Sequence, residues 1–505
     1  MIRRTSLLLA AALSGCTVGP NHVPPQMAVP AQFAEAPAAA APGAQVDLAR
    51  WWNAFGDAEL DRLVAAALAQ NLDVQTAASR VRQARAAVSA ARAALLPEVD
   101  AMGNATHVHF SKNAGFSSLA SLFGGGGASG SGGSGQSQGV ALPGEGITTY
   151  AVGFDSSWEL DLFGGGRRRV EGARARVEAA QWQARDTEVT LAAEVADAYL
   201  TLRMLQQREA VLRDEIARQR RALELIGDKA EAGLAPQDDL VRQRSGLTAA
   251  EAGLEPILAE QRIEMHALGL LAGQPPEALI AELTLPAAAL PPPPPVPPGL
   301  PSELLRRRPD VRAAERNLAA ATADIGVATA NLYPHFSLTG VAELISSALS
   351  NLLSPRSFQS TVSAGGMFPL LDFGRRRAQV DISKERKEQA YLAYQRTVLA
   401  ALKDVEDALV RVQAEQARGA SLRAGLADSD RALAAADARY RSGLVDLSAV
   451  LEARQAVLSA RDSLVSSDGA LRRNLASLYK ALGGGWDLEA AISPGPPAKA
   501  GAQPR

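Results

Sequence analysis

The 505-residue sequence contains 52 Lys and Arg against 54 Asp and Glu, a formal net charge of −2. This balance excludes a strongly basic surface for nucleic acid and gives no sign of another strongly charged partner. Aromatic residues make up only 5% of the chain, and Ala, Leu, Arg, Glu and Gln dominate its long uninterrupted segments. Length alone would suggest about three globular domains, but this composition favours long helices.

Residues 1–15 have the features of a secretory signal peptide: Arg3 and Arg4 precede an apolar run from Leu7 to Leu13 that ends in small residues. The run is too short to span a membrane. Leu13-Ser14-Gly15-Cys16 resembles a bacterial lipobox, in which the cysteine becomes the acylated first residue of the mature chain, and Cys16 is the only cysteine. A threonine follows it rather than an acidic residue, which resembles lipoproteins sorted to the outer membrane.

The next segments predict a tether, a helix and a hairpin. Residues 16–56, rich in Pro and Ala, predict an extended lipidated tether. A single helix is expected from Asp57 to about Leu95, and Pro97 ends it. Strand signals follow from Val99 to about Phe110. Residues 113–146, mostly Gly and Ser, predict an exposed loop, because no Gly-Lys-Ser/Thr follows to make a phosphate-binding loop.

Residues 150–162 predict a strand with one apolar face, because apolar side chains alternate with polar ones at period two. After Phe163-Gly164 the period changes to seven, which is typical of a coiled-coil helix. That helix is expected to reach Asp228 and would be about 95 Å long. A break at residues 232–236 then precedes a return helix from Gln237 to Ala272.

The chain is a tandem duplication. A shift of 210 positions places Phe163-Gly164 on Phe373-Gly374 and Gly233-Leu234 on Gly443-Leu444, and upstream a shift of 237 places Pro97 on Pro334. We therefore predict a first repeat at 57–284, a stiff proline-rich crossing at 285–301, a second repeat at 302–484 and a disordered tail at 485–505. The second repeat is expected to supply two more strands and helices over residues 374–441 and from 445 onward.

Four strands with an apolar face cannot lie in a bilayer as an open sheet, because their edges would leave peptide groups unpaired in hydrocarbon. No segment after the signal peptide reaches the about 18 apolar residues that a membrane helix requires. The sheet is therefore expected to close between chains, with two copies as the minimum and three giving twelve strands.

The sequence resembles the TolC-like outer-membrane efflux proteins, specifically the lipoprotein branch that works with resistance-nodulation-division pumps. Several motifs carry the resemblance: Cys16 in its lipobox, Arg308-Pro309-Asp310-Val311, Ile325-Gly326 with Leu332-Tyr333-Pro334, Leu371-Asp372-Phe373-Gly374, and Arg439-Tyr440-Arg441-Ser442-Gly443-Leu444. The resemblance implies a mainly α protein with a small β-barrel. Long antiparallel coiled-coil helices and two β-hairpins would form a homotrimer whose α-helical tunnel continues a twelve-stranded transmembrane barrel.

The resemblance also implies a function. The trimer would be a passive gated duct from periplasm to exterior for drugs, toxic small molecules or metal ions, anchored in outer-membrane lipid and needing no catalysis or cofactor. Its partners would be a periplasmic adaptor (membrane fusion) protein and an inner-membrane resistance-nodulation-division transporter. Gly233, Leu234, Gly443 and Leu444 resemble the adaptor-docking tips, with a purely structural helix-ending turn as the alternative.

The predicted periplasmic gate contains Tyr440, Arg441, Asp446 and Glu452. In the family an acidic ring commonly occupies the position of Glu452, and Tyr440 and Arg441, with Arg439, resemble the residues that hold the closed state. Three symmetry-related carboxylates would attract cations and repel one another. The alternative for Asp446 and Glu452 is exposed helix charge. Ser448 stands where some relatives carry an apolar constriction residue, which suggests a more polar gate.

Other functions are weaker interpretations of the same sequence. A type I secretion exit duct shares the fold, and a trimeric surface adhesin or structural spacer also uses coiled-coil helices. An anchored periplasmic enzyme is disfavoured because no Ser/His/Asp arrangement or nucleotide-binding motif is present. His107 and His109 share one strand face, but no clustered third ligand accompanies them, so no metal site is predicted. The sequence does not identify the cargo.

Overall fold

A computed structural model describes residues 17–36, 46–109, 146–285, 292–296 and 301–487. The predicted signal peptide, Cys16 and nearly all of the Gly- and Ser-rich loop lie outside these residues. Clustering of contacts divides the chain into two compact units. Of the described residues, the first contains the strands and the adjoining helix ends, over residues 17–22, 86–109, 146–174 and 320–387. The second contains the remaining helices.

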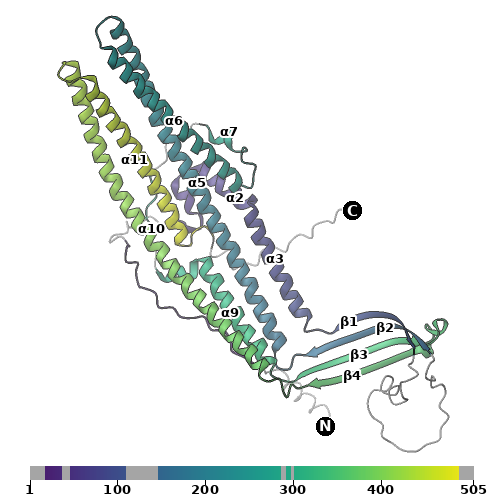
Figure 1. Cartoon of the computed structure of the whole chain (residues 1–505). Coiled ribbons are helices and arrows are strands. Elements are labelled where there is room, and N and C mark those ends of the chain that lie inside the picture. Colours follow the sequence, from purple (N-terminus) through teal and green to yellow (C-terminus); the bar gives the residue numbers. More distant parts are fainter. Residues whose placement is uncertain (1–16, 37–45, 110–145, 286–291, 297–300, 488–505) are drawn as a thin grey trace, which may run out of the picture. The chain divides into compact units, whose positions relative to one another are not determined.

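One antiparallel sheet in the order β1-β2-β3-β4 forms the centre of the first unit (Figure 1). Its strands are β1 (Glu98–His109), β2 (Gly146–Leu160), β3 (His335–Ser346) and β4 (Phe358–Met367). Two short 3-10 turns, η2 (Leu349–Asn351) and η3 (Pro355–Ser357), connect β3 to β4. The four predicted strands are confirmed, and β1 and β4 each pair with one neighbour only, so both are sheet edges.

The helices repeat in length as well as in sequence (Figure 1). In both copies a 67-residue helix precedes a 35-residue return helix: α5 (Gly165–Glu231) and α6 (Gln237–Leu271), then α10 (Arg375–Arg441) and α11 (Leu447–Ala481). A 22-residue helix precedes each strand pair, α3 (Leu72–Ala93) in the first copy and α9 (Pro309–Ala330) in the second. Within the described part of the chain, no helix is both long and apolar enough to cross a membrane.

The helix predicted from Asp57 to Leu95 is interrupted at Asn71, between α2 (Ala58–Gln70) and α3. Asn71 has an extended backbone with ψ of 137°, and its Oδ1 accepts hydrogen bonds from the N–H groups of Asp73 (2.7 Å) and Val74 (3.3 Å). This is an N-cap for α3. The second copy breaks at the equivalent position, Arg308, between α8 (Pro301–Arg307) and α9.

Part of the predicted tether belongs to the core. The 3-10 helix η1 (Leu48–Phe55) buries Trp51, whose ring stacks on Tyr479 with centroids 5.5 Å apart. Upstream, Phe33 is also buried, and the N–H groups of the two residues that follow it donate to the Glu406 carboxylate. The segments around Phe33 and Trp51 are therefore not a free tether. Burial of their aromatic side chains stabilises the fold, because it removes apolar surface from water.

The predicted disordered tail is ordered at its start. Trp486 is buried against Trp182, and its Nε1–H donates to the carbonyl oxygen of Arg307 at 3.1 Å. The N–H of Gly485 donates to the carbonyl oxygen of Leu48 at 2.7 Å. Gly485 therefore connects the end of the second repeat to η1, which precedes the first repeat. The short helix α7 (Ile280–Leu283) adds Leu283 to the hydrophobic cluster that contains Trp51 and Tyr479.

Arg308 joins three helices of the second unit. Its guanidinium donates to the Asp310 carboxylate at 2.7 and 3.1 Å, to Asp404 Oδ2 at 3.1 Å and to the carbonyl oxygen of Ala481 at 3.2 Å. The Arg308 side chain is only 12% exposed. Because hydrogen bonds from a buried charged donor are strong and costly to leave unmade, this cluster fixes the ends of α9 and α11 on α10.

Replacing Arg308 tests whether its hydrogen bonds hold the three helices together. We expect Arg308→Met to lower the free energy of unfolding by roughly 2 kcal/mol, because it leaves two carboxylates and a carbonyl without their charged donor. Thermal unfolding of the purified protein in detergent, followed by circular dichroism, measures the change. Lys403→Met, which removes an exposed ion pair with Asp407 nearby, is the control and should change little. Equal effects of both variants would contradict the assignment.

Candidate functional site

The turns between α5 and α6 and between α10 and α11 have the same geometry. Each helix ends in a Schellman motif, in which two N–H groups beyond the helix donate back to its last carbonyls. In the first turn the donors are Gly233 to Ala230 (3.1 Å) and Leu234 to Lys229 (2.7 Å), and in the second they are Gly443 to Tyr440 (2.9 Å) and Leu444 to Arg439 (2.9 Å).

These turns require glycine because of its backbone conformation, and not because a side chain would clash with a neighbour. Gly233 and Gly443 have φ of 70° and 69°, and nothing lies within 4 Å of where a Cβ would be. In many Schellman motifs the following apolar residue packs back onto the helix. Here Leu234 and Leu444 are 78% and 74% exposed, so each turn presents an apolar side chain outward.

The structure places Asp446 at the N-cap of α11. Its Oδ1 accepts a hydrogen bond from Ser448 Oγ at 2.6 Å and from the N–H of Ala449 at 3.4 Å. These hydrogen bonds, with Arg242 nearby, hold the pKa of the Asp446 carboxyl below its ordinary value of 3.8. The carboxylate of Asp446 and the hydroxyl of Ser448 are therefore used to cap the first turn of α11.

Among the described residues, the other predicted gate residues make no side-chain hydrogen bond or ion pair with one another. Tyr440 is half-buried in an apolar cluster, formed with Ile226, Leu447 and Val450, that joins the two hairpins. Arg439 and Arg441 are exposed, and so is Glu452. Among the described residues, the Glu452 carboxylate makes no hydrogen bond or ion pair. The structure thus brings Tyr440 to α11 but does not bring the arginines to Glu452.

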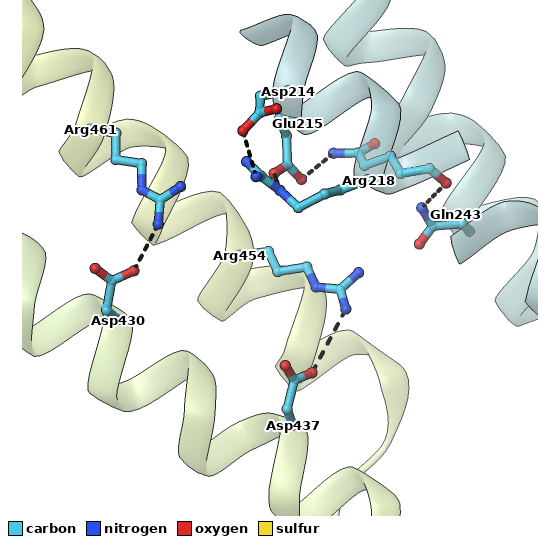
Figure 2. Close-up of polar contacts among 9 residues, drawn as sticks. Asp214, Glu215, Arg218, Gln243, Asp430, Asp437, Arg454 and Arg461 are labelled. Atoms are coloured by element: carbon cyan, nitrogen blue, oxygen red, sulfur yellow. Dashed lines mark hydrogen bonds and ion pairs between the residues drawn. The ribbon is translucent and has the colours of Figure 1, made fainter. Parts of the chain in front are cut away.

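Two ion pairs that the sequence analysis missed connect α10 to α11. Arg461 lies 3.2 Å from Asp430, and Arg454 lies 3.7 Å from Asp437 (Figure 2). Both pairs are symmetric about the turn, because antiparallel helices bring residues at equal distances from it opposite each other. Oppositely charged residues at equal distances from the turn were therefore a sequence signal that could have predicted both ion pairs. The first hairpin carries an ion pair at the equivalent position with the polarity reversed, Arg220 with Glu251 at 2.6 Å.

The first hairpin differs from the second in having a polar interior. Gln243 on α6 is 1% exposed, and its Nε2 donates to the carbonyl oxygen of Gln219 on α5 at 3.1 Å (Figure 2). The buried carboxylate of Glu215 accepts hydrogen bonds from Arg218 and Gln219, each at 3.1 Å. The equivalent of Gln243 in the second hairpin is Ala453. The Gln243 hydrogen bond therefore connects α6 to α5, whereas those of Glu215 lie within α5.

One two-point ion pair connects the hairpins at a distance from the turns. The Arg208 guanidinium on α5 donates to the two carboxylate oxygens of Asp462 on α11, at 2.6 and 3.0 Å. A two-point contact of this kind fixes the relative orientation of both side chains. Together with the apolar cluster around Ile226, it joins the two hairpins of one chain between the turns and the aromatic core.

The residues that follow Cys16 are bound to the first unit. Arg168, at the beginning of α5, is buried and donates to the carbonyl oxygens of Val18 and Gly19 at 3.1 Å and to Asn21 Oδ1 at 2.8 Å. Gly19 lies against Gly326 of α9, so closely that a Cβ on Gly19 would stand 2.5 Å from the Gly326 Cα. Cys16 itself is outside the described residues.

His107 and His109 lie on the edge strand β1. His107 Nδ1 lies 2.8 Å from Thr148 Oγ1 on β2, a cross-strand hydrogen bond. His109 lies two residues further along the same strand. In the part of the chain that the structure describes, no group of three or more His, Cys, Asp or Glu side chains is placed to hold a metal ion.

The capping role of Asp446 can be tested locally. We expect Asp446→Ala to accelerate amide hydrogen exchange at residues 447–450, because the first turn of α11 loses its side-chain acceptor, whereas Asp446→Asn should preserve protection. Since the folded-state pKa is lowered, the charged carboxylate stabilises the turn fully above pH 3.8, and this contribution is lost as pH falls through the lowered value. Mass spectrometry of tip peptides measures the exchange, and unchanged exchange in Asp446→Ala would contradict the cap.

Comparison with known proteins gives the family. Residues 63–274 and 300–484 match the family model described as outer membrane efflux protein. The pyoverdine export outer membrane protein OpmQ of Pseudomonas aeruginosa is 31% identical over 491 residues, covering 97% of this chain and 98% of that protein. Nodulation protein T of Rhizobium leguminosarum bv. viciae is 30% identical over 502 residues, covering 97% and 95%.

A solved structure of the outer-membrane channel OprN superimposes with a TM-score of 0.81 at 33% identity, over 93% of this chain and 100% of that one. A structure of CusC gives a TM-score of 0.75 at 25% identity, over 93% and 100%. The resemblance to TolC-like outer-membrane channels that the motifs indicated is thereby confirmed. The chain belongs to the outer membrane efflux protein family.

Proposed function

We propose that this protein is the outer-membrane channel component of a tripartite efflux system and provides a passive, gated duct from the periplasm to the exterior. One observation carries the proposal: the similarity to outer-membrane efflux channels includes both repeats, with the family match in each copy and the OprN fold over 93% of the chain. The work of such a protein is passage and not catalysis, and it requires no cofactor.

The duct is a homotrimer. Four strands with two unpaired edges cannot be stable alone in hydrocarbon, because each free N–H or C=O group in that medium costs several kcal/mol. Three copies give twelve strands, and their long helices continue the passage as a tunnel. The sheet order β1-β2-β3-β4 supports this assembly, because consecutive strands are neighbours and both ends of the order remain open.

The chain is held in the outer membrane by acylated Cys16. Residues 1–15 are the signal peptide and residues 16–56 the lipidated segment, followed by repeats at 57–284 and 302–484, with the crossing at 285–301 and the tail from 485. The position of residues 17–21 supports the anchor, because Arg168 fixes them at the beginning of α5, close in sequence to the end of β2.

The turns around Gly233-Leu234 and Gly443-Leu444 dock a periplasmic adaptor protein, which connects the duct to an inner-membrane resistance-nodulation-division transporter. The exposed leucines support this assignment, since an apolar side chain at the end of a polar hairpin gains stability when a partner covers it. Because each half of the chain has one such turn, a trimer would present two sets of three contacts.

The gate lies near the second turn and contains Tyr440, Arg441, Asp446 and Glu452. Glu452 is the acidic residue best suited to a ring, because its carboxylate is exposed and makes no bond among the described residues, whereas that of Asp446 is used in the cap. Three Glu452 carboxylates near a threefold axis would repel one another and attract cations.

The transporter selects the cargo, and the relatives suggest its range. Their names include pyoverdine export, cation efflux and antibiotic efflux. For this chain the cargo is accordingly drugs, toxic small molecules or metal ions that the inner-membrane partner has already captured.

If the turns dock an adaptor, replacing their exposed leucines with charged residues should weaken adaptor binding. The double variant Leu234→Glu/Leu444→Glu should no longer co-purify with its adaptor from chemically cross-linked cells, while the amount of channel in the outer membrane stays unchanged. Leu270→Glu, at a residue that is 68% exposed at the other end of α6, is the matched control. Loss of adaptor capture in the control, or none in the double variant, contradicts the docking assignment.

The gate predicts a change in conductance. In planar bilayers, the purified lipidated trimer should carry small or no single-channel current. Glu452→Ala should increase the current, because the shorter side chain widens the constriction and no longer holds a cation in it. Asp446→Asn, which removes a charge and keeps the cap, should change the current less. No conductance in any form, from protein shown to be inserted and trimeric, would count against the duct and favour an adhesin or spacer.

A further inference from the structure

A cavity of about 960 Å³ lies between α5 and α6, within the second compact unit. One wall is a face of α5 from Arg203 to Arg213, and the opposite wall is a face of α6 from Glu255 to Met265. Leu285, which follows α7, also lines the cavity and is 64% exposed. Cavities of this size that combine apolar walls with a few polar groups are typical of small-molecule sites.

The cavity coincides with a proline inside α6. Pro256 has no N–H group to donate to the carbonyl oxygen of Ala252, and a proline ring bends a helix at this point. A bend in α6 moves this helix relative to α5 beside the residues that line the cavity. The repeat-equivalent of Pro256, 210 positions later, is Ser466 in α11. The second hairpin therefore lacks this cause of a gap between its helices.

The buried part of the lining combines an apolar side chain with fixed polar groups. Met265 and Gln261 are buried, and Arg203 is 8% exposed. Both carboxylate oxygens of Glu209 are used: one accepts a hydrogen bond from Gln261 Nε2 at 2.6 Å, and the other accepts one from Arg213 Nε at 2.5 Å. The negative charge of Glu209 is therefore compensated within the protein.

Arg262 provides a cation at the exposed side of the cavity. Its side chain is exposed, and among the described residues its guanidinium makes no hydrogen bond or ion pair. Leu258, one helical turn earlier, lies on the same wall. The lining thus places an uncompensated guanidinium beside an apolar surface, which favours a ligand that carries both an anionic and an apolar group.

The second repeat neutralises the equivalent arginine within one helix. Arg472, which lies 210 positions after Arg262, is 5% exposed and forms an ion pair with Asp468, four residues earlier on α11. The equivalent of Asp468 in the first repeat is Leu258, on the cavity wall. The first repeat has an apolar residue where the second has a neutralising acid, so the charge of Arg262 is available to a ligand.

We propose that this cavity binds a small amphipathic anion, whose carboxylate, sulfonate or phosphate group contacts Arg262 and whose apolar body lies against Leu258 and Met265. Hydrogen bonds between a guanidinium and an anion are charge-assisted, and the apolar contacts remove further surface from water. Glu255 lies seven residues before Arg262, about 10 Å along α6, so the anionic group is directed to the arginine end. The site is separate from the turns and the gate, and it does not depend on the proposed function.

The fluorescent probe 8-anilinonaphthalene-1-sulfonate, a sulfonate on an aromatic body, tests the site in the full-length protein in phosphatidylcholine nanodiscs. After subtraction of empty nanodiscs, its fluorescence titration should saturate. Arg262→Leu should weaken the affinity roughly ten-fold, because the sulfonate loses a charge-assisted donor. Leu258→Asp should also weaken it, because the new acid neutralises Arg262 as Asp468 neutralises Arg472. Glu255→Gln should tighten binding roughly two-fold, because it removes a nearby negative charge.

Arg244→Leu is the matched control. It removes another exposed arginine of α6, one that does not line the cavity, and it should leave the affinity unchanged. Thermal unfolding followed by circular dichroism shows whether each variant is folded. Because the Arg262 side chain is exposed and makes no bond among the described residues, Arg262→Leu should unfold at the temperature of the wild type, so its binding result stands even if Leu258→Asp is destabilised.

The outcomes decide whether the cavity is a binding site. Saturable binding that Arg262→Leu weakens and Arg244→Leu does not supports the proposal. Equal affinities of the wild type and all variants would show that the probe binds elsewhere, and would overturn it. A wild type without saturable binding would also overturn it, because the cavity would then be filled by the protein itself, for example by residues 286–291, which follow Leu285 and lie outside the described residues.

Discussion

The need to pair every backbone N–H and C=O group governs this molecule. Helices meet that need within themselves, and the strand pairs β1·β2, β2·β3 and β3·β4 meet it for the middle of the sheet. The edges β1 and β4 do not, and no described element of the chain covers them. The apolar side chains of Phe373, Leu96 and Leu399 are also exposed. Both features support the proposed oligomer.

Most of the fold could be predicted because periodicity reports which faces are apolar. Alternation at period two gave the strands, recurrence at seven gave the long helices, and the two shifts gave the duplication. Asn71 was missed because a capping residue inside a periodic run looks like any other polar position. Trp51 and Trp486 were assigned to a tether and a tail because their packing partners, Tyr479 and Trp182, are far away in sequence.

The candidate site was less accessible to sequence reasoning. The glycine turns were located correctly, since positive φ has a residue signature. The function of Asp446 as a cap depends on the side-chain geometry of Ser448 and the Ala449 N–H, which spacing alone does not show. The pair Arg208–Asp462 joins residues 254 positions apart, and its partners cannot be chosen before the two hairpins are placed together. A ring of Glu452 depends on other copies and stays a prediction.

The reversed ion pairs of the two hairpins have a consequence for folding. Helices α5 and α10 have equal lengths, as do α6 and α11, so a wrong partnership between repeats would be geometrically acceptable. Exchange of partners would place Arg220 opposite Arg461 and Asp430 opposite Glu251, and both contacts would be repulsive. The polarity difference therefore favours the pairing of each long helix with its own return helix, in a chain whose two repeats have helices of equal length.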